Sequence, residues 1–266
     1  ATMIGNEHTL VEVIFACAQI GAIVVPLNTR LIAAEISTYL DLHGCKALVS
    51  ASEFSPSFKD FSVDIKIIVG ATLDGWHNYE KLLSKHIQSP PFTTTSLDDP
   101  YRLVMTGGTT GRSKGVLHSQ GGTIITVLSD VLEYGIQRGW KTLCVLPGYH
   151  VAGMEWGMFS IFSRSGTVIF PEDTSFTPRK YIDLVREREI EYLPLVPAVI
   201  NPLFEVWDKL PMQGVRTVVT TSAPTPVSLR KKLVEMFSKA NIYAAAGLSE
   251  SLNMATQGPK EFLTFP

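Results

Sequence analysis

The sequence has little charge and little cysteine, and each shortage excludes a class of protein. Only 18% of the 266 residues are charged, and 25 acidic against 23 basic side chains leave a formal net charge of −2. No dense basic run is present, so nucleic acid is not expected as a partner. The three cysteines, Cys17, Cys45 and Cys144, lie far apart and form no C-x-x-C pair. We therefore expect reduced thiols rather than a disulfide framework or a zinc site.

A membrane-spanning run is also missing. The most apolar stretch, residues 11–27, is interrupted by charged, glycine and proline residues and falls short of a spanning length. It lacks the basic leader and the cleavage site of a signal peptide. These features predict a cytoplasmic protein without a transmembrane segment. The chain begins on what reads as the tail of a strand and ends without a terminal helix, so we expect a fragment of a longer protein.

Apolar residues follow two alternating periods along the chain. Helical spacing predicts helices over residues 7–20, 31–43, 78–85, 119–134, 152–164, 181–189, 198–208 and 227–238. Short apolar runs predict strands at residues 22–25, 46–50, 65–69, 102–106, 142–146, 167–170, 191–196, 215–220 and 241–245. The alternation predicts an α/β fold with mostly parallel, doubly wound sheets covered by helices. A Ser-, Thr- and Pro-rich linker before residue 100 predicts a first subdomain over 1–95 and a second over 96–266.

The most informative stretch is the glycine-rich segment 106–115, which contains four glycines, three threonines and a lysine. Glycine allows close approach to the main chain, and consecutive N–H groups with a following helix can bind an anion. Threonine hydroxyls and Lys114 add donors and charge, so the composition predicts a loop that holds a polyphosphate. The Walker A spacing fails at Arg112, Ser113 and Gly115, which argues against an ordinary P-loop NTPase. A flexible surface turn is the alternative.

Three further motifs follow predicted strands. Residues 146–153, Leu-Pro-Gly-Tyr-His-Val-Ala-Gly, can present the His150 imidazole beside a cleft, although a loop histidine bonded to a carbonyl explains the pattern as well. Residues 220–224, Thr-Thr-Ser-Ala-Pro, have small side chains that would let a flat ring approach the backbone, or form a plain turn. Residues 245–250, Ala-Ala-Gly-Leu-Ser-Glu, place a hydroxyl beside a carboxylate, which suits Mg²⁺ and phosphate; an exposed turn is the alternative.

In this order and spacing, the motifs resemble those of the adenylate-forming (AMP-binding) enzymes, which include acyl-CoA synthetases, luciferases and the adenylation domains of peptide synthetases. The phosphate loop of that family usually reads Ser/Thr-Ser-Gly-Thr-Thr-Gly-x-Pro-Lys-Gly; here Gly107 replaces the serine and Ser113 the proline. The family's Tyr-Gly-x-Thr-Glu motif has Ala246 at its aromatic position, and Ser222 stands where a glycine is common. Residues 21–28 also resemble a family segment.

The resemblance implies a carboxylate-activating ligase that joins a small-molecule carboxylic acid to ATP and passes the acyl group to CoA. It implies catalytic roles for Lys114, His150 and Glu250, and a Mg²⁺ ligand at Glu250. The implied nucleotide-binding residues are Thr106, Gly107, Gly108, Thr109, Thr110, Gly111, Lys114, Ser222, Ala223, Pro224, Ala245, Ala246, Gly247 and Ser249. The family's ribose-binding Asp, hinge and C-terminal catalytic domain have no counterpart in the sequence, so the chain resembles the central part of the large N-terminal domain.

Several alternatives remain open from the sequence. A fatty or aromatic acid is preferred, because Trp156, Met158, Phe159 and Phe162 follow His150, although these residues are better explained as helix core. An amino-acid-activating adenylation domain is the alternative within the family. A non-catalytic or degenerate nucleotide-binding module is the alternative outside it, motivated by Ala246 and the altered phosphate loop. A carrier-protein thiol as the acceptor and a homodimer are also left open.

Overall fold

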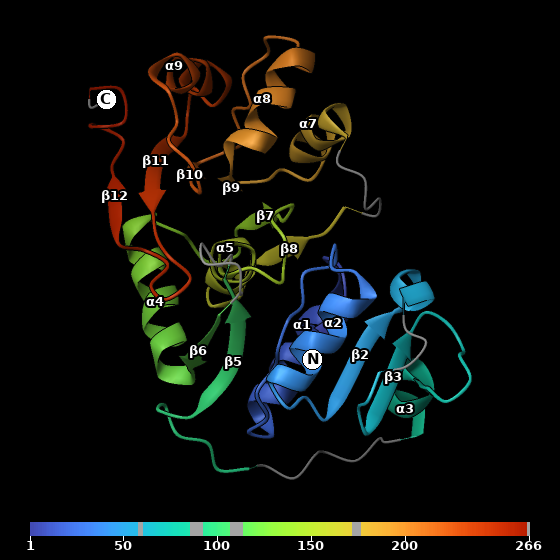
Figure 1. Cartoon of the computed structure of the whole chain (residues 1–266). Coiled ribbons are helices and arrows are strands. Elements are labelled where there is room, and N and C mark those ends of the chain that lie inside the picture. The colour runs from blue at the N-terminus through green and yellow to red at the C-terminus, as the bar shows by residue number, and fades with distance from the viewer. Residues whose placement is uncertain (58–60, 86–92, 107–113, 172–176, 265–266) are drawn as a thin grey trace. The chain divides into compact units, whose positions relative to one another are not determined.

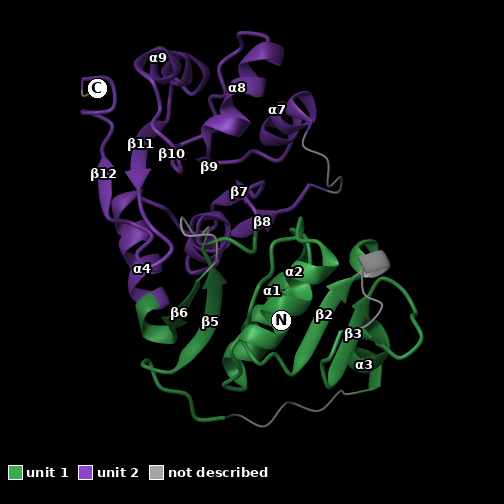
Figure 2. Cartoon of the chain, in the orientation of Figure 1, with its two compact units in different colours: residues 1–122, 148–150 green, residues 123–147, 151–266 purple. Residues whose placement is uncertain are grey.

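The computed structural model describes residues 1–57, 61–85, 93–106, 114–171 and 177–264 (Figure 1). The chain divides into two compact units (Figure 2). Residues 148–150 belong to unit 1 although they interrupt the sequence of unit 2. Unit 1 comprises Ala1–Gly122 with Gly148–His150, and unit 2 comprises Thr123–Pro147 with Val151–Pro266. The subdomain boundary at 95/96 stays a prediction. Within the described residues, no helix combines the length and apolar character needed to cross a membrane.

Unit 1 contains a parallel sheet with the order β1-β2-β3-β4 and a separate antiparallel pair, β5 and β6. Its strands are β1 (Thr2–Met3), β2 (Ala47–Ala51), β3 (Ile65–Val69), β4 (His77–Asn78), β5 (Pro100–Met105) and β6 (Gly115–Ser119). Its helices are α1 (His8–Gln19), α2 (Ala33–Leu42), the 3-10 turn η1 (Ser52–Ser57) and α3 (Tyr79–Lys85). Buried residues of α2 and of the sheet, among them Ile36, Leu40 and Leu48, form one core.

Two expectations for unit 1 have different outcomes. The helix from residue 78 is confirmed, because the Asn78 side chain caps α3 by accepting a hydrogen bond from the Lys81 N–H at 2.9 Å. The strand at 22–25 is wrong as a regular strand. Val24 makes an isolated bridge to Arg102, and Pro26 makes another to Thr2. Pro26 has no N–H to donate, so this residue contributes no donor of its own to a ladder.

Unit 2 contains a six-stranded sheet with the order β12-β11-β10-β9-β7-β8, parallel except for β12. The strands are β7 (Lys141–Leu143), β8 (Thr167–Ile169), β9 (Tyr192–Leu195), β10 (Thr217–Thr220), β11 (Asn241–Ala246) and β12 (Ala255–Gln257). The antiparallel edge strand β12 was not expected from the sequence. Thr220 of β10 pairs with Leu195 on one side and with Ala244 on the other, so three parallel strands end together.

Helices cover both faces of this sheet. They are α4 (Gln120–Glu133), α5 (Val151–Met154), the π-helix η2 (Glu155–Phe159), α6 (Ser160–Phe162), α7 (Pro178–Glu187), α8 (Pro197–Val206) and α9 (Val227–Met236). On one face, α7, α8 and α9 pack against alternate strand residues such as Leu193 and Val218. On the other, Tyr134 stacks edge-on against Tyr243 of β11, and its carbonyl accepts a bond from Thr217 Oγ1 at 3.1 Å. The doubly covered α/β architecture is therefore confirmed.

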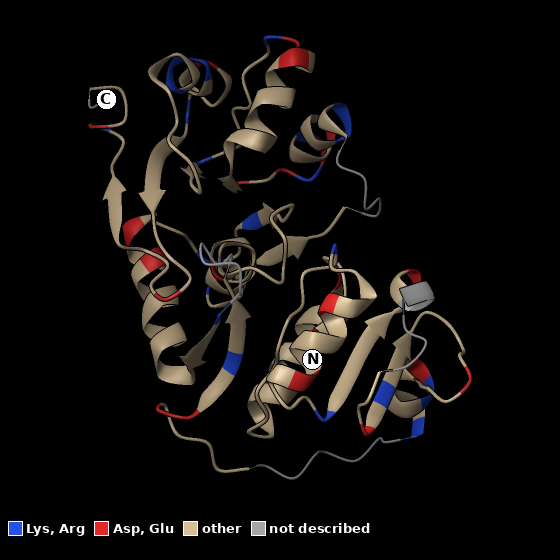
Figure 3. Ribbon diagram, in the orientation of Figure 1, with Lys and Arg blue, Asp and Glu red and all other residues tan. Residues whose placement is uncertain are grey.

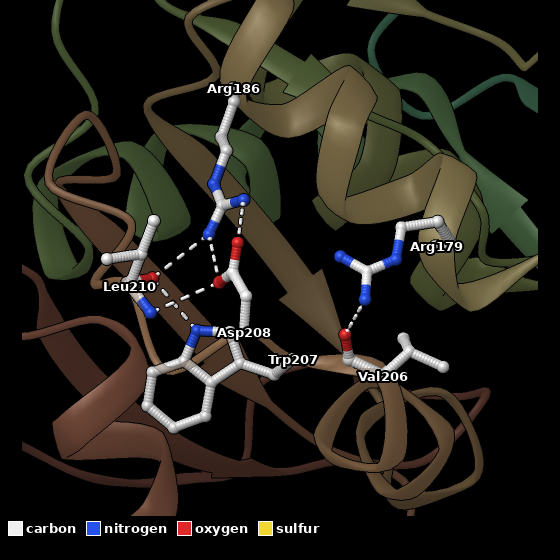
Figure 4. A network of polar contacts seen from close by, with 6 residues as sticks. All are labelled: Arg179, Arg186, Val206, Trp207, Asp208 and Leu210. Carbon is white, nitrogen blue, oxygen red and sulfur yellow. Dashed lines mark hydrogen bonds and ion pairs between the residues drawn. The ribbon is translucent and has the colours of Figure 1, made fainter.

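A polar network that was not predicted from the sequence links α7 to the segment after α8 (Figure 4). Arg186 donates two parallel hydrogen bonds to the Asp208 carboxylate, at 2.8 and 2.7 Å, and a third to the Leu210 carbonyl at 3.0 Å. The Trp207 indole N–H donates to the same carbonyl, and Arg179 donates to the Val206 carbonyl. Elsewhere, basic and acidic side chains are distributed through both units (Figure 3).

Candidate functional site

The glycine-rich segment connects the two antiparallel strands of unit 1. Met105 of β5 pairs with Gly115 of β6, and both the N–H and the hydroxyl of Thr106 donate to the Lys114 carbonyl, at 2.9 and 3.1 Å. Thr106 and Lys114 thus stand opposite each other at the base of a hairpin connection, with the Lys114 side chain exposed. The residues between them, Gly107, Gly108, Thr109, Thr110 and Gly111 included, lie outside the described part of the chain.

This geometry corrects one expectation. The segment was predicted to lead from a strand into a helix, whose N-terminus would add positive potential. The helix starts close to its predicted position, since α4 begins at Gln120, but the strand β6 lies between it and the glycine-rich segment. The antiparallel pairing with β5 keeps residues 115–119 extended, so the N-terminus of the helix does not adjoin the segment. An anion held by the segment would therefore depend on its own N–H groups, hydroxyls and Lys114.

His150 lies on a short segment that belongs to unit 1. The Gly148 N–H donates to Asn6 Oδ1 at 2.7 Å, which holds the start of the segment. His150 retains contact with solvent, but the atoms packed around the imidazole partly desolvate it and lower its pKa. A lowered pKa favours the neutral ring near pH 7. Burial raises the pKa of the neighbouring Tyr149 phenol, and Arg30 opposes that rise.

The glycine that ends this motif has a packing role. A Cβ on Gly153 would lie 2.1 Å from the Pro147 carbonyl oxygen, so only glycine lets α5 pack against the turn that precedes it. In the π-helix that follows, Trp156, Met158 and Phe159 are buried, as the helix-core interpretation predicts, whereas Phe162 of α6 is only half-buried. The π-helix itself gave no sequence signal.

In unit 2, two predicted nucleotide-binding segments come together because their strands are neighbours. β10 and β11 are parallel and in register up to Thr220 and Ala244, so the segments that follow them leave the same edge of the sheet. Ser222, Ala223 and Pro224 are exposed after β10, and Ala246 and Gly247 are exposed at the end of β11. We call these five residues the small-residue ledge. Ala245, in contrast, is buried.

Hydrogen bonds hold the residues that adjoin the small-residue ledge. Thr225 Oγ1 donates to Thr220 Oγ1 at 3.2 Å, and Thr220 Oγ1 donates to the Tyr243 carbonyl at 3.2 Å. The buried Arg230 donates from Nε to the Thr225 carbonyl at 2.7 Å and from Nη1 to the Phe262 carbonyl at 2.9 Å. Ser222 adopts φ +70°, the left-handed region that glycine prefers. This backbone conformation gives a physical reason for the glycine common at this position in the resembling family.

Ser249 and Glu250 occupy the centre of a tight turn between β11 and β12. Leu248 and Ser251 close it by exchanging backbone hydrogen bonds of 2.9 and 3.2 Å. The Met254 N–H donates to the Ala246 carbonyl at 2.9 Å, which continues the hairpin below the turn. Glu250 is exposed and Ser249 is half-buried. We call residues 248–251 the Ser249–Glu250 turn.

The donor set of this turn fits a particular kind of metal site. Among the described residues, no group of three or more His, Cys, Asp or Glu side chains could hold a metal ion. A site made by protein ligands alone is thus not formed there. Mg²⁺ often takes only one or two carboxylates and completes its shell with water and substrate phosphates. The single exposed carboxylate of Glu250 fits that use.

Sequence reasoning missed one polar contact of this hairpin. Asn253 Nδ2 donates to Asp130 Oδ1 at 3.1 Å, and Asn253 Oδ1 accepts from Thr256 Oγ1 at 2.9 Å. Asp130 is fully buried. A signal existed, because Thr123, Val127, Asp130 and Tyr134 recur at helical spacing and all prove to be buried. Because a carboxylate on the apolar stripe of a helix is unusual, Asp130 could have been identified from the sequence as a candidate buried polar contact.

Comparisons with known proteins agree with the motif order. Residues 1–263 match the family model described as AMP-binding enzyme. The indoleacetate–CoA ligase of Aromatoleum aromaticum is 26% identical, over 86% of this chain and 46% of its own. The long-chain-fatty-acid–CoA ligase FadD13 of Mycobacterium tuberculosis is 26% identical, over 96% of this chain and 50% of its own. The chain thus spans about half the length of these curated relatives.

A solved structure supports the same assignment at the level of the fold. The N-terminal domain of FACL13 from Mycobacterium tuberculosis superposes with a TM-score of 0.83 at 21% identity, covering 98% of this chain and 66% of that one. The expected match to a large N-terminal domain is therefore confirmed. With its ordered motifs, its doubly covered α/β sheet and a family match over nearly its whole length, the chain belongs to the AMP-binding enzyme family.

Proposed function

We propose that this chain supplies the ATP-binding part of an AMP-forming acid–thiol ligase. The observation that carries the proposal is in unit 2. There the small-residue ledge and the Ser249–Glu250 turn leave one edge of a parallel sheet, the usual place for ligands in such sheets. Exposed small residues leave room for a flat ring, and a hydroxyl and a carboxylate follow within three residues. This arrangement suits adenine with an adjoining metal-bound phosphate.

Each residue then has a defined task. Ser222, Ala223, Pro224, Ala246 and Gly247 line the adenine, with Ala245 behind them. Thr106 and Lys114, with the glycines and threonines between them, hold the β- and γ-phosphates. In unit 2, Ser249 and Glu250 bind phosphate and metal, and Glu250 is the protein ligand of Mg²⁺. The metal, when bound, would neutralise negative charge on the phosphates.

The proposed reaction has two steps. A carboxylate oxygen of the acid attacks the α-phosphorus, the bond to the bridging oxygen of the β-phosphate breaks, and pyrophosphate leaves. The CoA thiol, having lost its proton, then attacks the acyl carbon, and AMP leaves with the bonding pair. Lys114 and preorganised N–H groups stabilise charge that builds on pyrophosphate. His150, neutral near pH 7, lies on the side of the acid's carboxylate.

The acid is proposed as fatty or aromatic. The names of the two relatives, one an indoleacetate and one a long-chain-fatty-acid ligase, support this range of acids. An amino acid remains the alternative within the family. Outside it, the exposed Ala246, at the position of the family's usual adenine-stacking aromatic, favours a nucleotide-binding module without turnover as the second candidate.

The test is carboxylate-dependent ATP–pyrophosphate exchange by the full-length protein, with fatty, aromatic and amino acids. Exchange with fatty or aromatic acids is expected, and Lys114→Ala should reduce it at least about tenfold, because a full charge next to the phosphates is lost. Lys81→Ala, at an exposed position of α3 in the same unit, is the matched control and should leave exchange unchanged. Binding of Mg·ATP without exchange for any acid would favour the degenerate module.

A further inference from the structure

The Ser249–Glu250 turn is carried by a hairpin at the edge of the unit 2 sheet. Above the last paired residues, Ala246 and Ala255, the connection is held by the Leu248–Ser251 exchange and by the bond from Met254 to Ala246. Backbone bonds of this kind set the shape of the turn. They do not set its place relative to the helices that cover the sheet.

One side-chain contact supplies that tie. Asn253 follows the turn by two residues, and its amide donates to Asp130 of α4, 123 positions away in sequence. Its carbonyl accepts from Thr256 of β12. The amide of Asn253, three residues after Glu250 in sequence, therefore joins the helix to the edge strand. Because each end of the amide has its own partner, the orientation of the side chain is determined.

Burial of the Asp130 carboxylate at this position is energetically unfavourable. Its side chain is fully buried, and Oδ2 has no hydrogen bond of good geometry from any described residue. Burial is the main cause that raises the pKa of Asp130, with Glu155 and Glu133 adding to the rise and Trp156 and Asn253 opposing it. An apolar side chain in this position would cost the fold less. Because burying this carboxylate costs free energy of folding, we expect Asp130 to have a role that an apolar side chain could not fill.

We infer that Asp130 and Asn253 are positioning residues that hold the Ser249–Glu250 turn in its place on the sheet edge. This inference rests on the proposed function in so far as the turn serves Mg²⁺ and phosphate. Asp130 touches neither group; it acts through Asn253, whose orientation it sets. Loosening the pair lets the turn move relative to the ledge, so Mg·ATP is held in fewer productive geometries.

The test compares four variants of the full-length protein. Asp130→Leu and Asn253→Ala remove the contact, one from each side. Asp130→Asn keeps an oxygen that can accept from Asn253 Nδ2 and is the conservative rescue. Thr217→Val is the matched control: it deletes one buried hydrogen bond on the same sheet face, at the opposite end of β10.

Two readouts are needed. The first is hydrogen exchange of the peptide that contains the Leu248, Ser251 and Met254 amides, which needs no activity. We expect it to exchange roughly tenfold faster in Asp130→Leu and Asn253→Ala, and to stay as in the wild type in Asp130→Asn and Thr217→Val. The second is ATP–pyrophosphate exchange, in which the first two variants should raise the KM for Mg·ATP about tenfold and leave the KM for the acid unchanged.

The outcomes separate the two proposals. Unchanged protection of the turn in Asn253→Ala would overturn the positioning role, whatever the activity. A raised KM for the acid with a protected turn would also overturn it, because Asn253 would then be contacting the acid. If the wild type exchanges no pyrophosphate with any acid, the proposed function fails, and hydrogen exchange still decides whether the pair holds the turn. Should Asp130→Leu not fold, the half-buried Asn253 supplies the same test.

Discussion

The backbone carbonyl oxygen of Leu252 lies 1.4 Å from the position that a Cβ atom on Gly247 would occupy. No side chain can be accommodated there, so the two strands of the β11–β12 hairpin can approach only if residue 247 is glycine. This close contact lies just outside the Leu248–Ser251 bonds that close the Ser249–Glu250 turn. Gly247, which matches the glycine of the family's Tyr-Gly-x-Thr-Glu motif, is thus also required by packing.

Replacing Gly247 with alanine should open this hairpin. We expect Gly247→Ala to destabilise unit 2 by about 2–3 kcal/mol. It should also reduce Mg·ATP binding by the full-length protein at least about tenfold, because the turn would be displaced. Denaturant unfolding and calorimetric titration measure the two effects. Gly214→Ala is the control, since the nearest atom to its Cβ lies 3.9 Å away; equal losses in both variants would contradict the explanation.

Ser222 offers the opposite experiment. Its φ of +70° is unfavourable for any residue with a Cβ, by about 1 kcal/mol or more. Ser222→Gly should relieve that strain and, after the extra freedom of glycine in the unfolded chain, stabilise the protein by about 0.5 kcal/mol. Ser228→Gly, near the start of α9, should destabilise it instead. A loss of stability in Ser222→Gly, measured by denaturant unfolding, would show that the serine side chain has a role of its own.

The buried carboxyl of Asp130 predicts how stability changes with pH. Burial raises its pKa to about 7, from about 3.9 in an unfolded chain. The folded state therefore holds the proton more tightly than the unfolded state. The stability contribution of Asp130 is fully present below about pH 4 and is lost as the pH rises to about 7. At about 1.4 kcal/mol per pKa unit, a rise of roughly three units sets an upper limit of about 4 kcal/mol.

Asp130→Asn removes this titration. We expect the variant to gain stability relative to the wild type as the pH rises from 4 to 7, and the difference to level off above that. Unfolding free energies measured at half-unit intervals between pH 4 and 8 would show it. Thr217→Val, which removes a buried hydrogen bond on the same sheet face but no titratable group, should give a constant difference. A constant difference for Asp130→Asn as well would mean that the Asp130 carboxyl titrates normally.

The Arg186–Asp208 pair predicts a second pH dependence with the opposite sign. The hydrogen bonds from Arg186 lower the pKa of Asp208, so the contribution of the pair is present above about pH 4 and is lost as the pH falls below it. Arg186→Lys keeps the charge but loses the paired donors, and should lower the unfolding temperature at pH 7. Arg188→Lys, at an exposed position, is the control. A deficit that persists unchanged at pH 2 would argue against the pair.

Much of the fold follows from local sequence pattern. Helical periodicity located α1, α2, α4, α7, α8 and α9 to within a few residues, because each buries one stripe against a sheet. Continuous apolar runs located β2, β3, β9, β10 and β11, since strands covered on both faces need no polar alternation. Even Pro194 inside β9 did not prevent that strand from forming, as its pairing with Val219 on β10 shows.

What the sequence alone determined, then, is the type and order of the elements, the family, and the segments that follow strand ends. Tertiary structure alone decided the rest. That residues 115–119 form a strand between the glycine-rich segment and α4 depends on pairing with β5, and that β12 exists at all depends on pairing with β11. The Asp130–Asn253 contact joins residues 123 positions apart. Local periodicity records which face of an element is buried; it carries no information about the partner, which only the folded chain brings into contact.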